Sequence, residues 1–236
     1  LINLISSFFI FYGVYMVVQG HVLDLFAVQP LYGSWFIPLG FLVLFTGIID
    51  GIDGAMARLL GIKSKSGAWF DNVIDRISDI LMLVGLIPGS ILILSDFGLN
   101  FVWIVWTNIF IIQIYEYIRA RHEGLGLHEL KPFIGERPVR IMIIASSFII
   151  YGISSFSVLI TYIINPDATA LWASTHTGVT TWTILISQMI LLGIMVLSSI
   201  QLGNYSFKKL KEIDTQPREI SESDKQIIKQ TEKQKT

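Results

Sequence analysis

Long apolar stretches separated by short polar segments make up most of this chain. Several of them approach or exceed the roughly 20 residues that a helix needs to cross a bilayer. Two look short because aspartates occupy their polar ends, so we expect those helices to project beyond the hydrocarbon. The pattern predicts an all-α, polytopic membrane protein with six transmembrane helices, at about 1–19, 35–49, 76–95, 100–118, 141–164 and 179–203.

The composition agrees with this pattern. Of the 236 residues, 53% are hydrophobic and 15% are charged, and the mean hydropathy is +0.63, whereas a soluble domain carries about 25% charged residues. The region 208–236 is rich in Lys, Glu, Gln and Ser, a composition typical of disorder. We therefore expect a six-helix transmembrane domain at 1–207 and a polar, disordered cytoplasmic tail at 208–236. Because the first residue is Leu, we also expect an N-terminal piece to be missing.

Lys and Arg are distributed unevenly between the apolar stretches. The segments near 20–34, 96–99 and 165–178 contain none, so all the basic residues lie on the opposite set of connections or after the last stretch. Positive charge accumulates on the cytoplasmic side of membrane proteins, which predicts an integral cell-membrane protein with both termini in the cytoplasm. The chain has no cysteine, which excludes disulfides and thiolate metal sites. No nucleic-acid partner is expected.

Four aspartates lie at helical spacings near the cytoplasmic edge. Asp50 and Asp53 fall on one stripe of the second predicted helix, and Asp71 and Asp75 fall on one stripe of the third. Carboxylates beside hydrocarbon are costly unless something compensates them, and two adjacent antiparallel helices can bring these four together. Several carboxylate oxygens suit magnesium, manganese or calcium. The spacing therefore predicts a divalent-cation site that faces the cytoplasm.

A plainer interpretation applies to each aspartate alone, because single carboxylates at helix ends are often solvated or paired with nearby Arg and Lys. Asp79 in particular either pairs with Arg76 or supports the other aspartates. The interleaved small residues favour the cation site, since Gly51, Gly54 and Ala57 leave one side of the second helix nearly bare. A nucleotide or diphosphate can then approach the backbone closely. Pro38 and Pro88 are expected to kink the second and third helices.

A second basic cluster lies between the fourth and fifth predicted helices. Pro138 suits the first turn of the fifth helix, which would direct the neighbouring arginines into the cytoplasmic cavity. Clustered arginines can grip a phosphate through forked hydrogen bonds; alternatively, they follow the positive-inside rule and contact lipid headgroups. The candidate residues for binding the phosphate of a substrate, here called the acceptor-binding residues, are Arg119, Arg121, Lys131, Arg137 and Arg140.

The aspartates and small residues form the pattern Asp50-x-x-Asp53-Gly54-x-x-Ala57-Arg58, eight further residues, and Gly67-x-x-x-Asp71-x-x-x-Asp75. This pattern resembles the signature of the CDP-alcohol phosphotransferase family and matches it at every position. The resemblance implies a six-helix membrane domain that forms a homodimer, with its site at the cytoplasmic end. It also implies a reaction in which a hydroxyl displaces CMP from a CDP-linked lipid or alcohol to form a phosphodiester.

The resemblance further implies a role for each residue of the pattern. Asp50, Asp53 and Asp71 resemble the ligands of two Mg²⁺ or Mn²⁺ ions that hold the CDP diphosphate. Asp75 resembles a ligand that also removes the proton from the attacking hydroxyl, and it is the implied catalytic residue. The positions implied to line the CDP pocket are Gly54, Ala57, Arg58 and Gly67.

Further strings resemble the phosphatidylinositol-phosphate synthase branch and its archaeal archaetidyl counterparts. They lie at 75–79, 117–121 and 136–140, and the resemblance implies inositol-1-phosphate as acceptor. That branch commonly shows Gln-Arg near the end of the sixth helix, where this chain has Gln201-Leu202, so the acceptor alcohol stays open. The first helix begins with Asn3, which resembles the family's P-N-x-I/L-T entry without its Pro.

Two other functions are compatible with intramembrane carboxylates. Intramembrane prenyltransferases also hold a diphosphate with aspartates and magnesium, but they need a second Asp-rich motif, and the chain has none. An ion or metal transporter tends to carry internal repeats and a midplane site, whereas this cluster lies at one end. We therefore expect a phospholipid-biosynthesis transferase with a CDP-lipid donor, a small polar alcohol acceptor and membrane lipids as its partners.

Overall fold

The computed structural model describes residues 2–22, 31–61, 64–88, 90–94, 98–127, 133–165, 167 and 169–215. Within these ranges some side chains are not described, those of Asp53, Gly54, Ala57 and Arg58 among them. The described part is almost wholly helical. Its helices are α1 (Ile2–Val22), α3 (Leu31–Ser34), α4 (Phe36–Leu59), α5 (Lys65–Val84), α6 (Val102–Gly124), α7 (Arg137–Ile164) and α8 (Thr169–Thr215).

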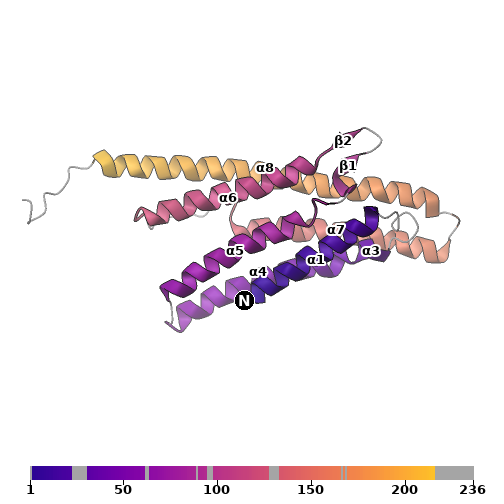
Figure 1. The fold of residues 1–236 in the computed structure, drawn as a ribbon, viewed down its shortest axis with the longest axis horizontal. Coiled ribbons are helices and arrows are strands. Elements are labelled where there is room, and N and C mark those ends of the chain that lie inside the picture. Colours follow the sequence, from indigo (N-terminus) through magenta and orange to yellow (C-terminus); the bar gives the residue numbers. More distant parts are fainter. Residues whose placement is uncertain are drawn as a thin grey trace, which may run out of the picture.

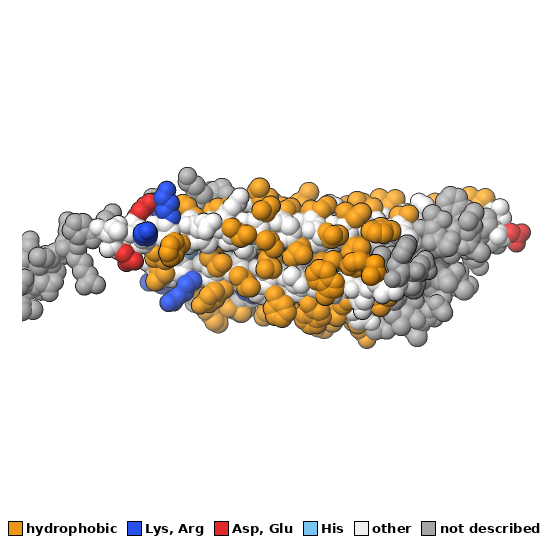
Figure 2. Space-filling model, turned by 90° about the horizontal axis from the view of Figure 1, so that it is seen from above, with side chains coloured by type: hydrophobic (Ala, Val, Ile, Leu, Met, Phe, Trp, Pro, Cys, Tyr) orange, Lys and Arg blue, Asp and Glu red, His pale blue; other side chains and the backbone are white. Residues whose placement is uncertain are grey.

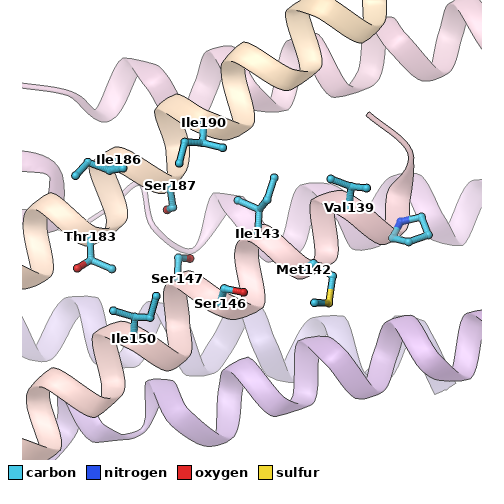
Figure 3. Close-up of a pocket in the computed structure, with 11 residues that line it drawn as sticks. Val139, Met142, Ile143, Ser146, Ser147, Ile150, Thr183, Ile186, Ser187 and Ile190 are labelled. Carbon is cyan, nitrogen blue, oxygen red and sulfur yellow. The ribbon is translucent and has the colours of Figure 1, made fainter. Parts of the chain in front are cut away.

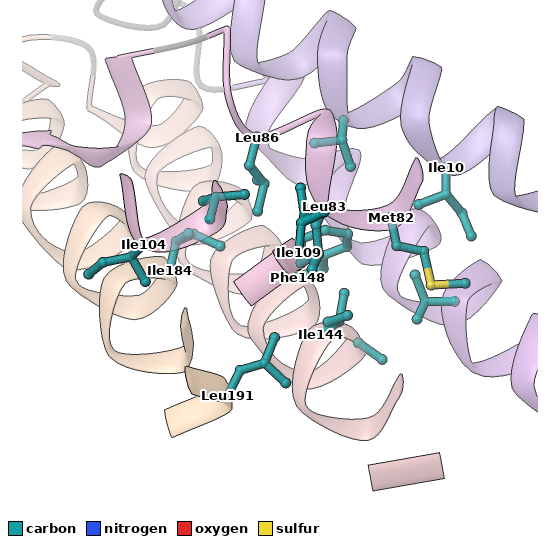
Figure 4. Close-up of a cluster of buried hydrophobic side chains, with 14 of the residues drawn as sticks. Ile10, Met82, Leu83, Leu86, Ile104, Ile109, Ile144, Phe148, Ile184 and Leu191 are labelled. Carbon is teal, nitrogen blue, oxygen red and sulfur yellow. The ribbon is translucent and has the colours of Figure 1, made fainter. Parts of the chain in front are cut away.

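The long helices lie roughly along one axis and form an elongated bundle (Figure 1). Helix α1 packs against α4 and α5, α7 packs against α4 and α8, and α6 packs against α8. The buried core between them includes Ile10 of α1, Leu83 of α5, Phe148 of α7 and Leu191 of α8 (Figure 4). The bundle thus brings α7 beside α4 and α5, which precede it by more than fifty residues in the sequence, at one end.

The outer faces of the helices carry apolar side chains. Phe8, Phe41, Phe110 and Met189 are each more than half exposed, and Figure 2 shows hydrophobic side chains along the length of one face, with its Lys and Arg near one end. Among the described helices, two stretches are long and apolar enough to cross a membrane, Arg137–Thr161 and Gly178–Thr215. Shorter apolar stretches lie in α1 and α4, so a count of six spans stays a prediction.

The third predicted helix differs from the structure mainly at its C-terminal end. Helix α5 begins at Lys65, before the apolar stretch, as expected for a helix that continues through its aspartates. It ends at Val84, however, and not near residue 95. Pro88 therefore follows the helix in a tight turn and does not kink it; in that turn the Ile87 N–H donates to the Val84 carbonyl. Proline disfavours helical backbone in the preceding residue, which accounts for the early end.

Two smaller elements occupy the connection after α5. They are the 3₁₀ turn η1 (Ser90–Leu92) and a short antiparallel hairpin of β1 (Ile93–Leu94) and β2 (Leu99–Asn100). Pro38 lies in the first turn of α4, where the missing N–H has no intrahelical partner in any case. Neither proline therefore has the helix-interior position that the predicted kinks require.

Helix α8 is longer than the apolar pattern predicts. It continues to Thr215, so residues 208–215 are helical, although the composition predicts a disordered tail from residue 208. The Lys and Glu residues of this segment are good helix formers, and their exposed positions suit a helix that leaves the apolar bundle. The rest of the predicted tail, 216–236, lies outside the described residues.

Candidate active site

Three of the signature aspartates come together at one end of the bundle. Asp50 lies on α4, and Asp71 and Asp75 lie one turn apart on α5. Their carboxylates offer ligand atoms that all lie within 4.8 Å of one another. The expected convergence of the two stripes is therefore observed for these three residues. Their role as metal ligands stays a prediction.

Other residues of the signature are placed less fully. Asp53, Gly54, Ala57 and Arg58 lie on α4 beyond Asp50, but their side chains are outside the described residues. Gly51 is exposed, and a Cβ added there would meet nothing within 4 Å, which agrees with a bare helix surface.

Gly67 lies in the first turn of α5, where its N–H donates to the Ser64 hydroxyl at 3.0 Å. A Cβ at Gly67 would lie 2.8 Å from that hydroxyl oxygen. The glycine therefore allows the N-terminal cap of α5 to close tightly, beside the turns that carry the aspartates.

Arg137 enters the aspartate cluster from the first turn of α7. Its Nη1 atom lies 2.7 Å from Asp50 Oδ2 and also contacts Asp75 Oδ1, while its Nε lies 3.6 Å from Asp79 Oδ1. The Nη2 atom is buried and has no hydrogen-bond partner in the described part of the chain. A guanidinium thus supplies positive charge to two of the three clustered carboxylates.

Arg140, one helical turn further along α7, has a different environment. Its side chain is 1% exposed, and its Nη2 donates to Asp79 Oδ2 at 2.7 Å and to Glu116 Oε1 at 2.8 Å. Its Nη1 donates to the Gly135 carbonyl at 2.9 Å. All these contacts lie inside the protein, so Arg140 ties α5, α6 and α7 together.

A polar cavity of about 340 Å³ adjoins the aspartates. Asp71 and Asp75 contribute to its lining from α5, Arg119 and Glu123 from α6, and Arg137 from α7. Of the five predicted acceptor-binding residues, Arg119 and Arg137 therefore line this cavity.

The other three candidates are placed differently. Arg140 is buried in the ion pairs described above and does not line the cavity. Arg121 is exposed on α6 and is also absent from the lining, while Lys131 lies outside the described residues. The acceptor-binding role of all five stays a prediction, and the geometry favours Arg119 and Arg137.

Burial raises the pKa of Asp75, which lies just outside the predicted membrane spans, to about 7. The guanidinium of Arg137 opposes this shift, whereas the nearby carboxylates of Asp50 and Asp71 add to it. The cluster therefore lacks positive charge even with Arg137 in place. A divalent cation would supply that charge, and carboxylate oxygens are the ligands that magnesium and manganese prefer. The donor set fits such an ion.

Two residues beside the cluster were not assigned a role from the sequence. Asn3 of α1 is buried, and its Nδ2 donates to Asp50 Oδ1 at 3.0 Å. Glu116 of α6 is also buried and pairs with Arg140 and with Arg76. The signal for Glu116 was its position, since a carboxylate inside the predicted span 100–118 needs a buried partner or a function.

An apolar groove of about 620 Å³ lies between α7 and α8. Figure 3 shows Val139, Met142 and Ile143 of α7 facing Ile186 and Ile190 of α8 across it. Its lining also includes Pro138, the residue that follows Arg137. The groove thus reaches from the apolar part of the bundle to the end that carries the charged site.

Comparison with known proteins decides the family. The family model described as CDP-alcohol phosphatidyltransferase matches residues 2–193. The chain belongs to the CDP-alcohol phosphatidyltransferase family. It is similar to the archaetidylinositol phosphate synthase of Pyrococcus horikoshii, with 31% identity over 129 residues (55% of this chain and 64% of the relative). It is also similar to the phosphatidylinositol phosphate synthase of Mycobacterium marinum, with 35% identity over 144 residues (59% of this chain and 56% of the relative).

These matches span less than two thirds of the length of either relative. A similar fold occurs in the crystal structure of Mycobacterium tuberculosis phosphatidylinositol phosphate synthase in complex with manganese and citrate. The TM-score is 0.52 at 23% identity, and the match covers 87% of this chain and 82% of the other. At this identity the likeness supports the helical fold, which is that of a membrane enzyme.

Proposed function

We propose that this CDP-alcohol phosphatidyltransferase transfers a phosphatidyl-type group from a CDP-linked lipid to a hydroxyl acceptor in phospholipid biosynthesis. The acceptor oxygen forms a new bond to the lipid-bearing phosphorus, and the bond from that phosphorus to the CMP oxygen breaks. One observation carries the proposal: Asp50, Asp71 and Asp75 of the signature converge beside a polar cavity that is large enough for a small alcohol.

The aspartates hold the donor's diphosphate through a divalent cation in this proposal. Asp50, Asp53, Asp71 and Asp75 are the proposed ligands of two such ions. Magnesium or manganese bound there would neutralise the diphosphate and stabilise the departing CMP. Asn3 fixes the Asp50 carboxylate through its hydrogen bond, and such outer contacts orient metal ligands in general.

Asp75 is the proposed general base. It lines the polar cavity, so an acceptor hydroxyl placed there can reach its carboxylate, which burial makes more basic than an ordinary aspartate. A cation that binds the acceptor oxygen would also make its hydroxyl more acidic, so that a carboxylate within reach can accept the proton. Asp75 therefore takes the hydroxyl proton as the new phosphorus–oxygen bond forms.

The rest of the donor is assigned to two surfaces. Gly54, Ala57, Arg58 and Gly67 are the proposed lining of the CDP pocket, because they match the family signature. The groove between α7 and α8 is the proposed position of a donor hydrocarbon chain. Its lining is mostly apolar, and it begins at Pro138, beside the arginine that contacts the aspartates.

A phosphorylated acceptor fits the cavity best. Arg119 and Arg137 line it, and arginine pairs well with phosphate oxygens. The names of the similar proteins, archaetidylinositol and phosphatidylinositol phosphate synthases, support inositol-1-phosphate as the first acceptor to test. Gln201 and Leu202, where Gln-Arg is common in that branch, keep other phosphorylated alcohols such as glycerol-3-phosphate under consideration.

The six helices of 20 residues or more are proposed to span the cell membrane, with the charged end in the cytoplasm. The uneven distribution of Lys and Arg and the apolar outer faces support this orientation. The homodimer implied by the family resemblance is likewise a proposal.

A CMP-release assay tests the proposed function. Protein in detergent or liposomes receives CDP-diacylglycerol or CDP-archaeol together with inositol-1-phosphate, glycerol-3-phosphate, serine or inositol. We expect CMP release that needs a divalent cation, stops with EDTA, and is faster with a phosphorylated acceptor. The Asp71→Asn variant is the matched control because it keeps side-chain size and removes one clustered carboxylate. CMP release no faster than this control with every donor and acceptor would contradict the proposal.

A further inference from the structure

Glu116 is a buried residue in the lining of the polar cavity, and it joins two arginines from different helices. Its Oε2 atom lies 2.9 Å from Arg76 Nη2 of α5, and its Oε1 atom lies 2.8 Å from Arg140 Nη2 of α7. The Glu116 side chain is 4% exposed, and a buried carboxylate is costly unless both of its oxygens are paired. Here both are.

Arg76 is held in one orientation by these contacts. Its Nη2 atom also donates to Asn72 Oδ1 at 2.7 Å, so Glu116 and Asn72 share one side of the guanidinium. Its Nη1 atom is buried, makes no hydrogen bond to the residues that the structure describes, and lies 3.9 Å from Asp79 Oδ2. The hydrogen bonds described for the guanidinium thus use Nη2, and Nη1 has unused donor capacity.

A second donor with the same property belongs to the same cavity. Arg137 Nη2 is buried and has no hydrogen-bond partner within the described ranges, and Arg76, Glu116 and Arg137 all contribute to the cavity lining. Buried donors without partners are uncommon and call for an explanation. A phosphate brought by the acceptor offers several oxygens to two such arginines.

We propose that Arg76 contacts the phosphate of the acceptor and that Glu116 is the positioning residue that holds Arg76 in place. This inference rests on the proposed function and deepens it, because Arg76 adds a cation to the predicted acceptor-binding set. Glu116 acts through Arg76 and not on the donor, since both of its carboxylate oxygens are engaged by arginine.

The test compares Glu116→Gln, Arg76→Gln and the double variant in CMP-release kinetics. Each single variant should raise the KM for inositol-1-phosphate by about tenfold or more, the effect expected from losing a charge-assisted hydrogen bond. The double variant should be no worse than Arg76→Gln alone, because Glu116 works through that residue. The KM for the CDP-lipid and the Mn²⁺ half-saturation should change by less than about twofold, because the ion pairs of Arg76 and Glu116 involve Asp79, Arg140 and each other.

The matched control is Asn108→Leu on the same helix. Asn108 is buried and donates to the backbone oxygen and to Oε1 of Gln188 at 2.9 and 2.8 Å, so its loss also breaks a buried contact between helices. This control should lower the unfolding temperature and leave the acceptor KM unchanged. A purely structural role for Glu116 would give the same two results.

Several outcomes would overturn the inference. One is an acceptor KM of Glu116→Gln that matches Asn108→Leu; another is a double variant whose effect is the product of the two single effects. If Glu116→Gln does not fold, Arg76→Gln decides alone, and an unchanged acceptor KM refutes the phosphate contact. A wild-type protein that releases no CMP refutes the proposed function instead, so the two failures are distinguishable.

Discussion

Replacing Arg137 by Gln should make the protein bind divalent cations more tightly when no substrate is present. In the structure the Arg137 guanidinium contacts two carboxylates of the aspartate cluster, with Nη1 2.7 Å from Asp50 Oδ2. A metal ion needs the same oxygens, so the guanidinium and the ion compete. Glutamine keeps most of the side-chain volume and some hydrogen bonding while it removes the charge.

The size of the effect follows from the distances. The ligand atoms of the clustered carboxylates lie within 4.8 Å of one another, and two charges at that limit repel by about 3.5 kcal/mol at an effective dielectric constant of about 20. The attraction between a guanidinium and a carboxylate about 4 Å away is about 4 kcal/mol at the same dielectric constant. Water screens both values because Asp50 and Asp75 are 23% and 17% exposed. We therefore expect about 1.5 to 3 kcal/mol, or roughly 10- to 100-fold tighter binding.

Titration of detergent-solubilised protein with Mn²⁺, followed by electron paramagnetic resonance of the free ion, measures this affinity. Arg119→Gln is the control, since Arg119 lines the same cavity but pairs only at 3.6 Å with the exposed Glu123. It changes the net charge equally. If Arg137→Gln binds Mn²⁺ no more tightly than this control, the guanidinium and the ion do not compete and the reasoning is wrong.

Three further predictions follow from the same site. Asp75→Asn should abolish CMP release while CDP-lipid binding is largely retained; full loss of donor binding would rule out its role as base. Because the pKa of Asp75 is about 7 without metal, Mn²⁺ affinity should fall as the pH drops below 7, by up to about tenfold per unit; a flat profile between pH 6 and 8 would contradict this. In Gly135→Ala the new Cβ would lie 2.6 Å from Ser198 Cβ, displacing the carbonyl that accepts from Arg140. Thermal unfolding should show lower stability that Ser198→Gly restores, and failure of that rescue would refute the steric cause.

The aspartate cluster could be predicted from the sequence because its determinants are local. Asp71 and Asp75 are four residues apart, so any helix places them on one face. Only residues 60–64 separate α4 from α5, so the ends that carry Asp50 and Asp71 cannot lie far apart. Few alternative arrangements satisfy both constraints.

The contrast between Arg137 and Arg140 could not be predicted in the same way. The two residues lie one turn apart on α7, and the sequence treats them as equivalent cations. Their difference comes from Asp79 and Glu116 on two other helices, which bury Arg140 between them. Long-range partners of this kind cannot be deduced from spacing along one chain.

The ends of the helices could be predicted only in part, because hydropathy locates the ends of apolar stretches and a helix can end before or after them. Helix α5 ends at Val84 although apolar residues continue beyond it, since Gly85 and Pro88 favour a turn. Helix α8 continues to Thr215 although the apolar stretch has ended. At both helix ends the backbone follows the turn and helix propensities of the local residues, and not the limits of the apolar stretch.

The central claim is that Asp50, Asp71 and Asp75 together hold a divalent cation. Anomalous diffraction at the manganese edge, from crystals of the protein grown with Mn²⁺ and CDP, tests it most directly. We expect a peak within coordination distance of all three carboxylates, with the Arg137 guanidinium displaced from Asp50. A clear manganese peak elsewhere, with these three carboxylates bound only to arginine or water, would contradict the account.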